Sequence, residues 1–409
     1  MKNPAPYLVL AVCSLSLAAV GGCGRRGLSK VDAGDSGVNQ DPDGATVPDV
    51  GSAGEADASS TGEADASGAG QTDLPTQPGP DVGAETLPCT PAPQEPTSLG
   101  LLEGDLPGSG IALLGDRIFV GTFDRADPPQ GRIVGLSLST TASTTFRVGS
   151  NLPVSMTARQ DALFYAQGAA EANSSPGGGW AINYTHVARL DLQTGQVSLF
   201  DNPPDFVSPM VGTVVGNANG DIFWVVSDGW GPPSVLMGWD PSTGAANTVL
   251  PAGQIMDVWT DPSTLYWRSV NEANHVVLLS MPIGGGPVSV LVEWLDPVPN
   301  VPLLLAMDDE HLYYAKYGDI PSGIMAMPKG GGEGKTIVPN VDPTLHAIDD
   351  THIYWVNNGE VALYRAPKNG GEVETVWAFP NRWVRDLAVD ACNIYWTVLN
   401  PPELYARAK

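Results

Sequence analysis

The pattern of residues 347–371, AIDDTHIYWVNNGEVALYRAPKNGG, most restricts the fold, because short apolar strands alternate in it with turn-forming residues. Aromatic and β-branched residues such as those of IYWV pack well on a half-buried pleated sheet. Asp side chains bond backbone amides two residues on, and Asn and Gly accept the positive φ that hairpin turns need. Together with residues 372–376, the segment predicts a four-stranded antiparallel meander.

The core strand of this meander returns along the chain, with an aromatic residue at its centre each time. The seven central residues are Phe119, Phe164, Phe223, Tyr266, Tyr313, Tyr354 and Tyr395. They are separated by about 40 to 60 residues, a period typical of propeller blades built from four short strands. The sequence therefore predicts an all-β fold, a seven-bladed β-propeller of four-stranded antiparallel blades.

A second repeated position supports this prediction. An aspartate stands four residues before the first apolar residue of the core strand in the last four repeats: Asp261, Asp308, Asp349 and Asp390. The final repeat stops at residues 404–407, its third strand, which would leave an unpaired sheet edge. We therefore expect residues 97–103 to pair beside residues 404–407 and to close the ring as an N-terminal strand.

The N-terminus is typical of an exported protein. Residues 1–22 contain one lysine, an apolar run and small residues before Cys23, and the run is too short for a stable membrane span. Val20-Gly21-Gly22-Cys23 resembles the lipobox of bacterial lipoproteins, in which cleavage before the cysteine leaves it as the lipid-bearing N-terminus. The resemblance implies a protein anchored at the cell envelope, and we expect the outer membrane of a Gram-negative bacterium. The alternative is an ordinary cleaved signal followed by a chance cysteine.

Residues 23–88 are predicted to form a lipidated, disordered, acidic linker. They are rich in Gly, Ala, Ser, Thr, Asp and Pro and contain no aromatic residue, so they cannot bury enough apolar surface to fold. The formal net charge of the whole chain is −25, which argues against a nucleic-acid partner. The predicted parts are thus a signal peptide at 1–22, this linker, and a propeller at 89–409.

The chain has four cysteines, two of which are left for a disulfide. Cys13 leaves with the signal peptide and Cys23 takes the lipid. Cys89 precedes the proposed closing strand, and Cys392 lies in the hairpin turn of the last repeat, so ring closure would bring them together. In an oxidising compartment we expect a Cys89–Cys392 disulfide, and the alternative is two free thiols.

The core strands also carry a family resemblance. Residues 394–397 (IYWT), 353–355 (IYW) and 265–267 (LYW), each preceded by Asp, resemble the YWTD-type repeat and the uncharacterised exported bacterial propellers of similar pattern, many of them lipoproteins. The resemblance covers about residues 97–409. It implies a propeller that presents a binding face, and no ligand-binding residue is carried over from it.

Residues with metal or cofactor chemistry are few. His311 and His352 hold the same repeat position and are expected in turns, whereas His186, His275 and His346 are expected in or near loops of three different blades. No pair of them has the spacing of a zinc site, and the chain lacks the Asp-x-Asp-x-Asp loop of calcium sites. We expect neither a metal nor a cofactor.

A binding face can be predicted from topology. The connections between strands two and three, and those between blades, emerge on one face of a propeller, and loops on a rigid scaffold often carry function. The candidate residues are Glu171, Trp180, Tyr184, His186, Asp228, Trp230, Arg268, His275, Tyr317 and Trp383. Exposed aromatic residues with a few charges are typical of recognition surfaces. The alternative is that these tryptophans only pack the loops onto the scaffold.

Two functional classes follow from these residues. A binding or scaffolding lipoprotein would hold a protein, peptide or glycan on the predicted face, as a monomer and without turnover. A propeller enzyme of the lyase or lactonase type would need His and acidic groups around the channel mouth. Asp257 and Asp386 hold equivalent positions there, but Leu304 and Leu345 occupy the same position in the two blades between them. We therefore favour the binding protein.

Overall fold

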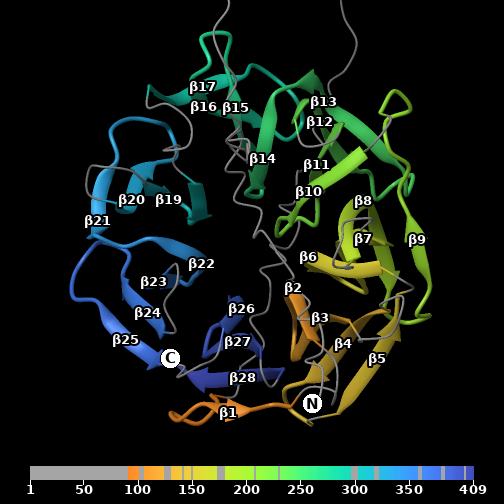
Figure 1. The fold of residues 1–409 in the computed structure, drawn as a ribbon. Helices are drawn as coiled ribbons and strands as arrows, with labels where there is room; N and C mark the ends of the chain where they lie inside the picture. Colours follow the sequence, from red (N-terminus) through yellow and green to blue (C-terminus); the bar gives the residue numbers. More distant parts are fainter. Residues whose placement is uncertain are drawn as a thin grey trace, which may run out of the picture. The chain divides into compact units, whose positions relative to one another are not determined.

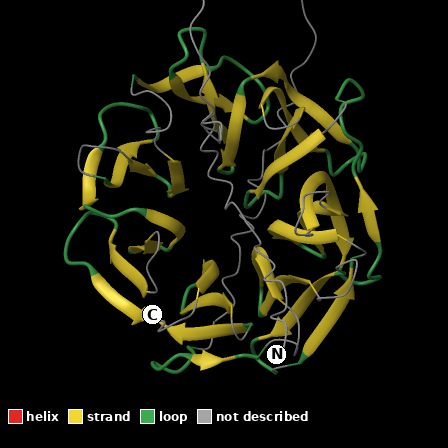
Figure 2. Cartoon of the chain, viewed as in Figure 1, coloured by secondary structure: helices red, strands yellow, loops and turns green. Residues whose placement is uncertain are grey.

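Every regular element in the described part of the chain is a β-strand (Figure 2). The computed structural model describes residues 91–100, 106–123, 130–140, 142–148, 151–172, 180–206, 209–228, 231–295, 303–316, 322–357, 362–378, 383–399 and 402–409. Its strands form seven four-stranded sheets, each of consecutive antiparallel neighbours, arranged as blades around a centre (Figure 1). The predicted seven-bladed propeller is therefore confirmed. No helix among these residues is long and apolar enough to cross a membrane.

Each blade runs from an inner strand to an outer one, in chain order. Blade 1 contains β2 (Leu106–Leu114), β3 (Arg117–Phe123), β4 (Gly131–Ser137) and β5 (Ser143–Arg147); blade 2 contains β6 (Asn151–Arg159), β7 (Ala162–Ala172), β8 (Trp180–Asp191) and β9 (Val197–Leu199). Blade 3 contains β10 (Pro209–Gly216), β11 (Ile222–Asp228), β12 (Gly231–Trp239) and β13 (Ala246–Gly253); blade 4 contains β14 (Ile255–Thr260), β15 (Thr264–Val270), β16 (Val276–Pro282) and β17 (Ser289–Trp294).

The remaining blades follow the same order until the last. Blade 5 contains β18 (Leu303–Met307), β19 (His311–Lys316), β20 (Gly323–Pro328) and β21 (Lys335–Pro339); blade 6 contains β22 (Pro343–Ile348), β23 (His352–Asn357), β24 (Ala362–Pro367) and β25 (Glu374–Ala378). Blade 7 contains β26 (Trp383–Val389), β27 (Asn393–Leu399) and β28 (Glu403–Ala408), and its outer strand is β1 (Thr97–Ser98).

The N-terminal strand closes the ring, as the sequence predicts. β1 pairs antiparallel with β28, with Thr97 opposite Ala406 (Figure 1). The closure extends beyond the strand, because the Leu99 amide donates to the Leu404 carbonyl at 2.8 Å. The Arg407 Nε also donates to the carbonyl of Gln94 at 2.6 Å, across 313 residues of sequence. The last blade thus has no unpaired third strand.

The core consists of seven apolar clusters, one at each junction between neighbouring blades. The seven aromatic residues predicted at the blade centres all lie on second strands, and each is at most 6% exposed. Across the closing junction, for example, Tyr395 and Leu404 of blade 7 pack with Ile118 and Val120 of blade 1. Burial of such side chains between sheets is the main favourable term in the stability of the ring.

Two backbone features repeat with the blades. The inner strand of every blade has an irregular register against the second strand, which is the mark of a β-bulge. Glycines with positive φ sit in the turns that lead to the outer strands of blades 4 to 6, such as Gly285, Gly331 and Gly370. Gly331 also lies against the neighbouring blade, where an added Cβ would stand 2.8 Å from the Leu291 carbonyl oxygen.

Residues 1–90 lie outside the described residues. The signal peptide, the lipidated Cys23, the linker and Cys89 therefore stay predictions. The backbone near Cys89 is nonetheless placed, because the Ala92 amide donates to Asn393 Oδ1 at 2.6 Å. Asn393 adjoins Cys392, and the Ala408 amide donates to the Pro93 carbonyl at 3.1 Å.

Candidate functional site

The repeated aspartates organise the hairpin turns between the inner and second strands of blades 4 to 7. In each turn, one carboxylate oxygen accepts hydrogen bonds from the backbone amides of the residues two and three positions further along the chain. Asp308 Oδ1, for example, accepts the amides of Glu310 at 3.0 Å and His311 at 2.8 Å. The other oxygen accepts the hydroxyl of the core tyrosine, and Tyr313 Oη lies 2.8 Å from Asp308 Oδ2. The repeat thus fixes the aspartate and the tyrosine together.

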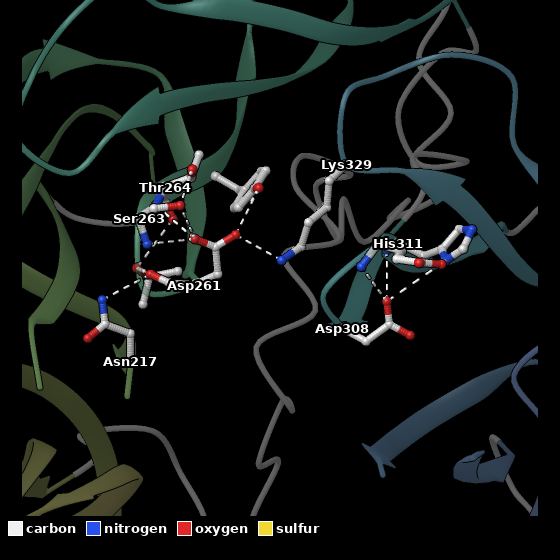
Figure 3. Close-up of polar contacts among 10 residues, drawn as sticks. Asn217, Asp261, Ser263, Thr264, Asp308, His311 and Lys329 are labelled. Atoms are coloured by element: carbon white, nitrogen blue, oxygen red, sulfur yellow. Dashed lines mark hydrogen bonds and ion pairs between the residues drawn. The ribbon is translucent and has the colours of Figure 1, made fainter. Parts of the chain in front are cut away.

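A lysine from the next blade completes three of these turns. Lys329 Nζ lies 2.8 Å from Asp261 Oδ2, Lys368 Nζ lies 2.7 Å from Asp308 Oδ2, and Lys409 Nζ lies 2.7 Å from Asp349 Oδ2. We call these contacts the lysine latches. Figure 3 shows the first of them, with Asp261 between its own turn residues and Lys329. They join blades 4 to 5, 5 to 6 and 6 to 7.

Electrostatics holds the latch carboxylates in the charged form. Burial alone would raise the pKa of Asp261, but the hydrogen bond from Lys329 and those from the turn amides lower it to about 2. The pKa values of Asp308 and Asp349 are lowered in the same way, against the effect of burial, by Lys368 and Lys409. The three ion pairs are therefore intact throughout the neutral range.

A groove of about 1160 Å³ lies between blades 5 and 6, at the end of the strands where these turns are found. Part of its lining is apolar, with the buried side chains of Tyr313 and Ile337 and the partly buried Met307 and Ile348. The hairpin turns of both blades supply the rest, and the Lys368 latch ties the two walls together. We call this feature the blade 5–6 groove.

The charged lining of the blade 5–6 groove is mostly acidic. Exposed carboxylates come from both walls, with Asp309 and Glu310 on blade 5 and Asp350 on blade 6. Glu333, in the turn before β21, adds a fourth exposed carboxylate, and Lys335 adds one exposed ammonium. The groove therefore attracts cations when empty.

Two histidines also line the groove, one from each wall. His311 and His352 are the first residues of β19 and β23. His311 Nδ1 lies 3.8 Å from Asp308 Oδ1 (Figure 3). His352 Nδ1 lies 2.8 Å from Thr351 Oγ1. The sequence predicts both histidines in turns, and the structure places each at the first position of the strand that follows the turn. The sequence did not reveal the groove that they share, although the similar tetrads DDEH at 308–311 and DDTH at 349–352 recur in these two blades.

A smaller hollow of about 460 Å³ occurs at the junction of blades 1 and 2. It is lined by Arg117, Phe146 and hydroxyl side chains such as Thr144 and Thr194. None of its lining side chains is acidic, so the two hollows differ in electrostatic character.

The predicted binding face lies at the opposite strand ends from the groove, and much of it lies outside the described residues. Trp230 and Tyr317 are outside them, and for Glu171, Trp180, Tyr184 and Trp383 only the backbone is described. His275 belongs to the 271–275 loop of blade 4, where its Nδ1 lies 2.7 Å from Glu293 Oε1. Asp228 ends β11 and is partly buried. The structure therefore brings no described cluster of these residues together.

Paired strands extend into the segments of blades 2 and 3 that carry several of the candidate residues. β7 and β8 pair as far as Ala172 opposite Trp180, so His186 lies within β8 instead of a loop. Small residues such as Ala169, Ala170 and Ala172 have low strand propensity, but each pairs with a residue of the opposite strand, and this pairing extends the hairpin. Similarly, β11 reaches Asp228 and β12 begins at Gly231.

Arg268 lies below the surface. Its side chain is 3% exposed, and its guanidinium binds the carboxylate of Asp257, with Nε 2.8 Å from Oδ1. The pair links the inner strand β14 to β15, where the two residues are register partners. A buried charge needs such a partner, so the role of Arg268 is to neutralise Asp257.

The inner strands carry two further titratable groups. His346 lies within β22, whereas the sequence predicts a position in or near a loop, and it bonds the backbone of Leu305 in the preceding blade. Desolvation lowers the pKa of His346 to about 4, although a hydrogen bond with the Leu305 backbone opposes this effect. Desolvation raises the pKa of Asp386 to about 6, against hydrogen bonds from the backbone of Leu387 and Ile111. Among the described residues, no three His, Cys, Asp or Glu side chains form a group that could hold a metal ion.

Comparisons with known proteins identify the fold and no family. No family model and no curated protein matches the chain. Among solved structures, an oligogalacturonate lyase from Vibrio parahaemolyticus is similar with a TM-score of 0.56 and 11% identity, over 76% of this chain and 92% of that one.

Two further solved structures resemble the chain to a similar degree. A virginiamycin B lyase from Staphylococcus aureus has a TM-score of 0.52 and 13% identity, over 77% of this chain and 99% of that one. A puromycin-hydrolysing peptidase from Mycobacterium tuberculosis has a TM-score of 0.52 and 12% identity, over 73% of this chain and 50% of that one. At such identities the similarity shows a shared propeller fold alone, and the YWTD-type resemblance stays an interpretation.

Proposed function

We propose that the chain is an exported binding propeller, tethered to the cell envelope by lipid on Cys23, that holds a protein, peptide or glycan without turning it over. The sequence at residues 20–23 supports the anchor. A linker of about 65 flexible residues would let the propeller reach roughly 40 to 50 Å from the membrane on average.

The blade 5–6 groove is the observation that carries this proposal. Ligand sites are concave and combine apolar surface with placed polar groups. The groove combines the side chains of Met307, Ile337 and Ile348 with the charged and polar side chains of the two hairpin turns. Its walls are held by the Lys368 latch and by the carboxylate of Asp308, whose hydrogen bonds fix the turn. A preorganised site loses little conformational freedom on binding, which favours affinity.

Photo-crosslinking in intact cells tests the proposal. Glu333, exposed at the groove, would be replaced by benzoylphenylalanine in the full-length protein. Asp205, exposed in the connection between blades 2 and 3, would be replaced in a matched control. We expect a discrete adduct at position 333 that is absent at position 205. Failure to form any adduct at position 333, with normal protein level and location, would contradict the proposal.

The anchor can be tested separately. The substitution Cys23→Ser removes the proposed lipid attachment, so we expect the protein to move from the membrane fraction to the soluble fraction on cell fractionation. Unchanged membrane association of this variant would contradict the lipid anchor and leave the groove unaffected.

A propeller enzyme of the lyase or lactonase type is the second candidate, with its site at the channel mouth. The shifted pKa values of His346 and Asp386 on neighbouring inner strands favour it, since catalytic groups are often perturbed. Oligogalacturonate, the substrate named for one of the similar structures, gives a direct assay. Turnover that is lost in both His346→Asn and Asp386→Asn would support the enzyme over the binding protein.

A further inference from the structure

We propose that the occupant of the blade 5–6 groove is an extended polypeptide segment in which lysine or arginine side chains alternate with apolar ones. This inference rests on the proposed binding function and specifies its ligand class. It follows from three observations: the apolar lining, the unpaired carboxylates, and the way in which this end of the ring already binds lysine.

The apolar lining requires apolar groups on the ligand. Met307 and Ile348 are only partly buried although both belong to the apolar clusters between blades, and both line the groove. Covering such side chains removes apolar surface from water, which favours binding. A small cation without apolar groups would leave this part of the groove exposed to water.

The carboxylates at the groove require positive charge. Asp309, Asp350 and Glu333 have no ion-pair partner among the described residues, and all three are exposed. Asp309 and Asp350 are equivalent residues of successive repeats, so they lie on opposite walls. A ligand that lies along the groove would therefore meet negative charge on both sides. The hollow between blades 1 and 2 is lined by Arg117 and by no acidic side chain, so it lacks these carboxylates.

The lysine latches show that this end of the ring recognises ammonium groups. Three times, an extended strand delivers a lysine to a carboxylate that a turn and a tyrosine hydroxyl hold in place. In two of the three cases the lysine follows a proline at the end of the third strand. The basic side chains of a bound segment would form the same kind of ammonium–carboxylate contact with Asp309 and Asp350, from a separate chain. Charge-assisted hydrogen bonds of this kind are the stronger class.

Defined peptides test the inference. Fluorescein-labelled octapeptides of alternating Leu and Lys, Leu and Gln, Leu and Glu, and Ser and Lys would be titrated with the full-length protein in detergent, with fluorescence anisotropy as readout. We expect the Leu/Lys peptide to bind at least about tenfold more tightly than the other three, with affinity that falls as salt is added. Equal binding of the Leu/Gln peptide would overturn the charge requirement, and equal binding of the Ser/Lys peptide would overturn the apolar one.

A matched pair of double variants locates the site. Asp309→Asn with Asp350→Asn removes two groove charges. Asp201→Asn with Asp205→Asn removes two exposed charges from the connection between blades 2 and 3. The groove variant should bind the Leu/Lys peptide about tenfold more weakly or worse, whereas the control variant should bind it less than about twofold more weakly. An equal loss in both would mean that the overall acidity of the protein attracts the peptide, and would overturn the inference.

The crosslinking experiment separates this inference from the proposed function. A specific adduct at position 333 together with peptides that fail to bind would retain a binding propeller whose ligand has different chemistry. Absence of the adduct at position 333 would contradict the proposed binding function itself. Spermine that competes fully with the Leu/Lys peptide at equal concentration would identify a small polyamine as the ligand and exclude the polypeptide.

Discussion

The ammonium of Lys409 lies 2.7 Å from the carboxylate of Asp349, so the residue that follows the last strand of blade 7 is bound to the inner hairpin of blade 6. Both side chains are largely buried, with 18% and 10% of their areas exposed. The contact repeats the arrangement of Lys329 and Lys368 one and two junctions earlier. The latches are therefore a property of the repeat, and the stability of the later blades should depend on them.

Removal of one latch should destabilise the propeller. We expect Lys409→Met to lower the free energy of unfolding by about 1 to 2 kcal/mol, because Asp349 keeps its backbone partners but loses a partly buried cation. Urea unfolding of the variant gives the value. Lys335→Met is the matched control, since Lys335 is exposed and makes no ion pair within the described residues. A similar loss in both variants would show that the latch contributes nothing specific.

Acid should weaken the same contacts. The pKa of Asp261 is about 2 in the folded protein, whereas the ordinary value, which applies in the unfolded chain, is 3.8. A carboxyl whose pKa is depressed by folding adds stability that is complete above the higher value and is lost as pH falls towards the lower one. The parent protein should therefore lose stability between about pH 4.5 and pH 2.5, as measured by urea unfolding. We expect this loss to be smaller by about 1 to 2 kcal/mol in the Asp261→Asn variant. A variant with the same loss as the parent protein would refute this assignment.

Asp386 should have the opposite pH dependence. Its pKa rises from 3.8 to about 6 on folding, so its contribution is complete below about pH 4 and is lost as pH rises through 6. We expect Asp386→Asn to be more stable than the parent by about 1 to 3 kcal/mol at pH 7.5 and equal to it near pH 4. Thermal unfolding at the two pH values provides the comparison. The same difference at both pH values would count against a neutral carboxyl.

A fourth latch can be created at the closing junction. Leu138 holds the position of the latch lysines, because its amide donates to the Asp116 carbonyl as that of Lys368 does to Thr351. Asp390 accepts the hydroxyl of Tyr395 at 2.8 Å, and no described residue forms an ion pair with it. We expect Leu138→Lys to exceed the uncharged Leu138→Gln in stability by about 0.5 to 1 kcal/mol. The difference should vanish when Asp390→Asn is added, and a difference that persists would place the lysine elsewhere.

The Cys89–Cys392 disulfide can be examined chemically. The hydrogen bond between Ala92 and Asn393 brings the two cysteines within a few residues of a common contact. We predict that the mature protein, denatured without reductant, has no reactive thiol. Cys392→Ser should then lower the stability by up to about 5 kcal/mol, since the bond would close a long loop. Detection of two thiols per chain would refute the pairing.

The repeat of the sequence predicted most of the fold. Tyr266 and its six equivalents marked the second strand of every blade, because a buried aromatic residue on a paired strand is encoded locally. Residues 97–98 could be placed beside β28 because an unpaired edge had to be covered. The strand position of His346 was not predicted, because a single polar residue within an inner strand resembles a residue in or near a loop when only the sequence is considered.

The groove could not be predicted in the same way. Its walls meet through contacts such as that of Lys368 with Asp308, which are 60 residues apart in sequence. The recurrence of Pro-Lys after the third strand was visible at residues 328–329 and 367–368, but a repeated position does not reveal which neighbour it touches. The residues of the opposite face, such as Trp230 and Tyr317, lie outside the described residues, so that face stays a prediction.

Closure of the ring by β1 also determines when folding of the propeller can be completed. The Gln94 carbonyl and Arg407 are 313 residues apart, so the final junction cannot form until Arg407 has been synthesised. Until then the first blade presents an open flank to its surroundings, and folding intermediates of this kind are prone to misassembly. A chaperone that covers this flank would have the most to protect in that interval.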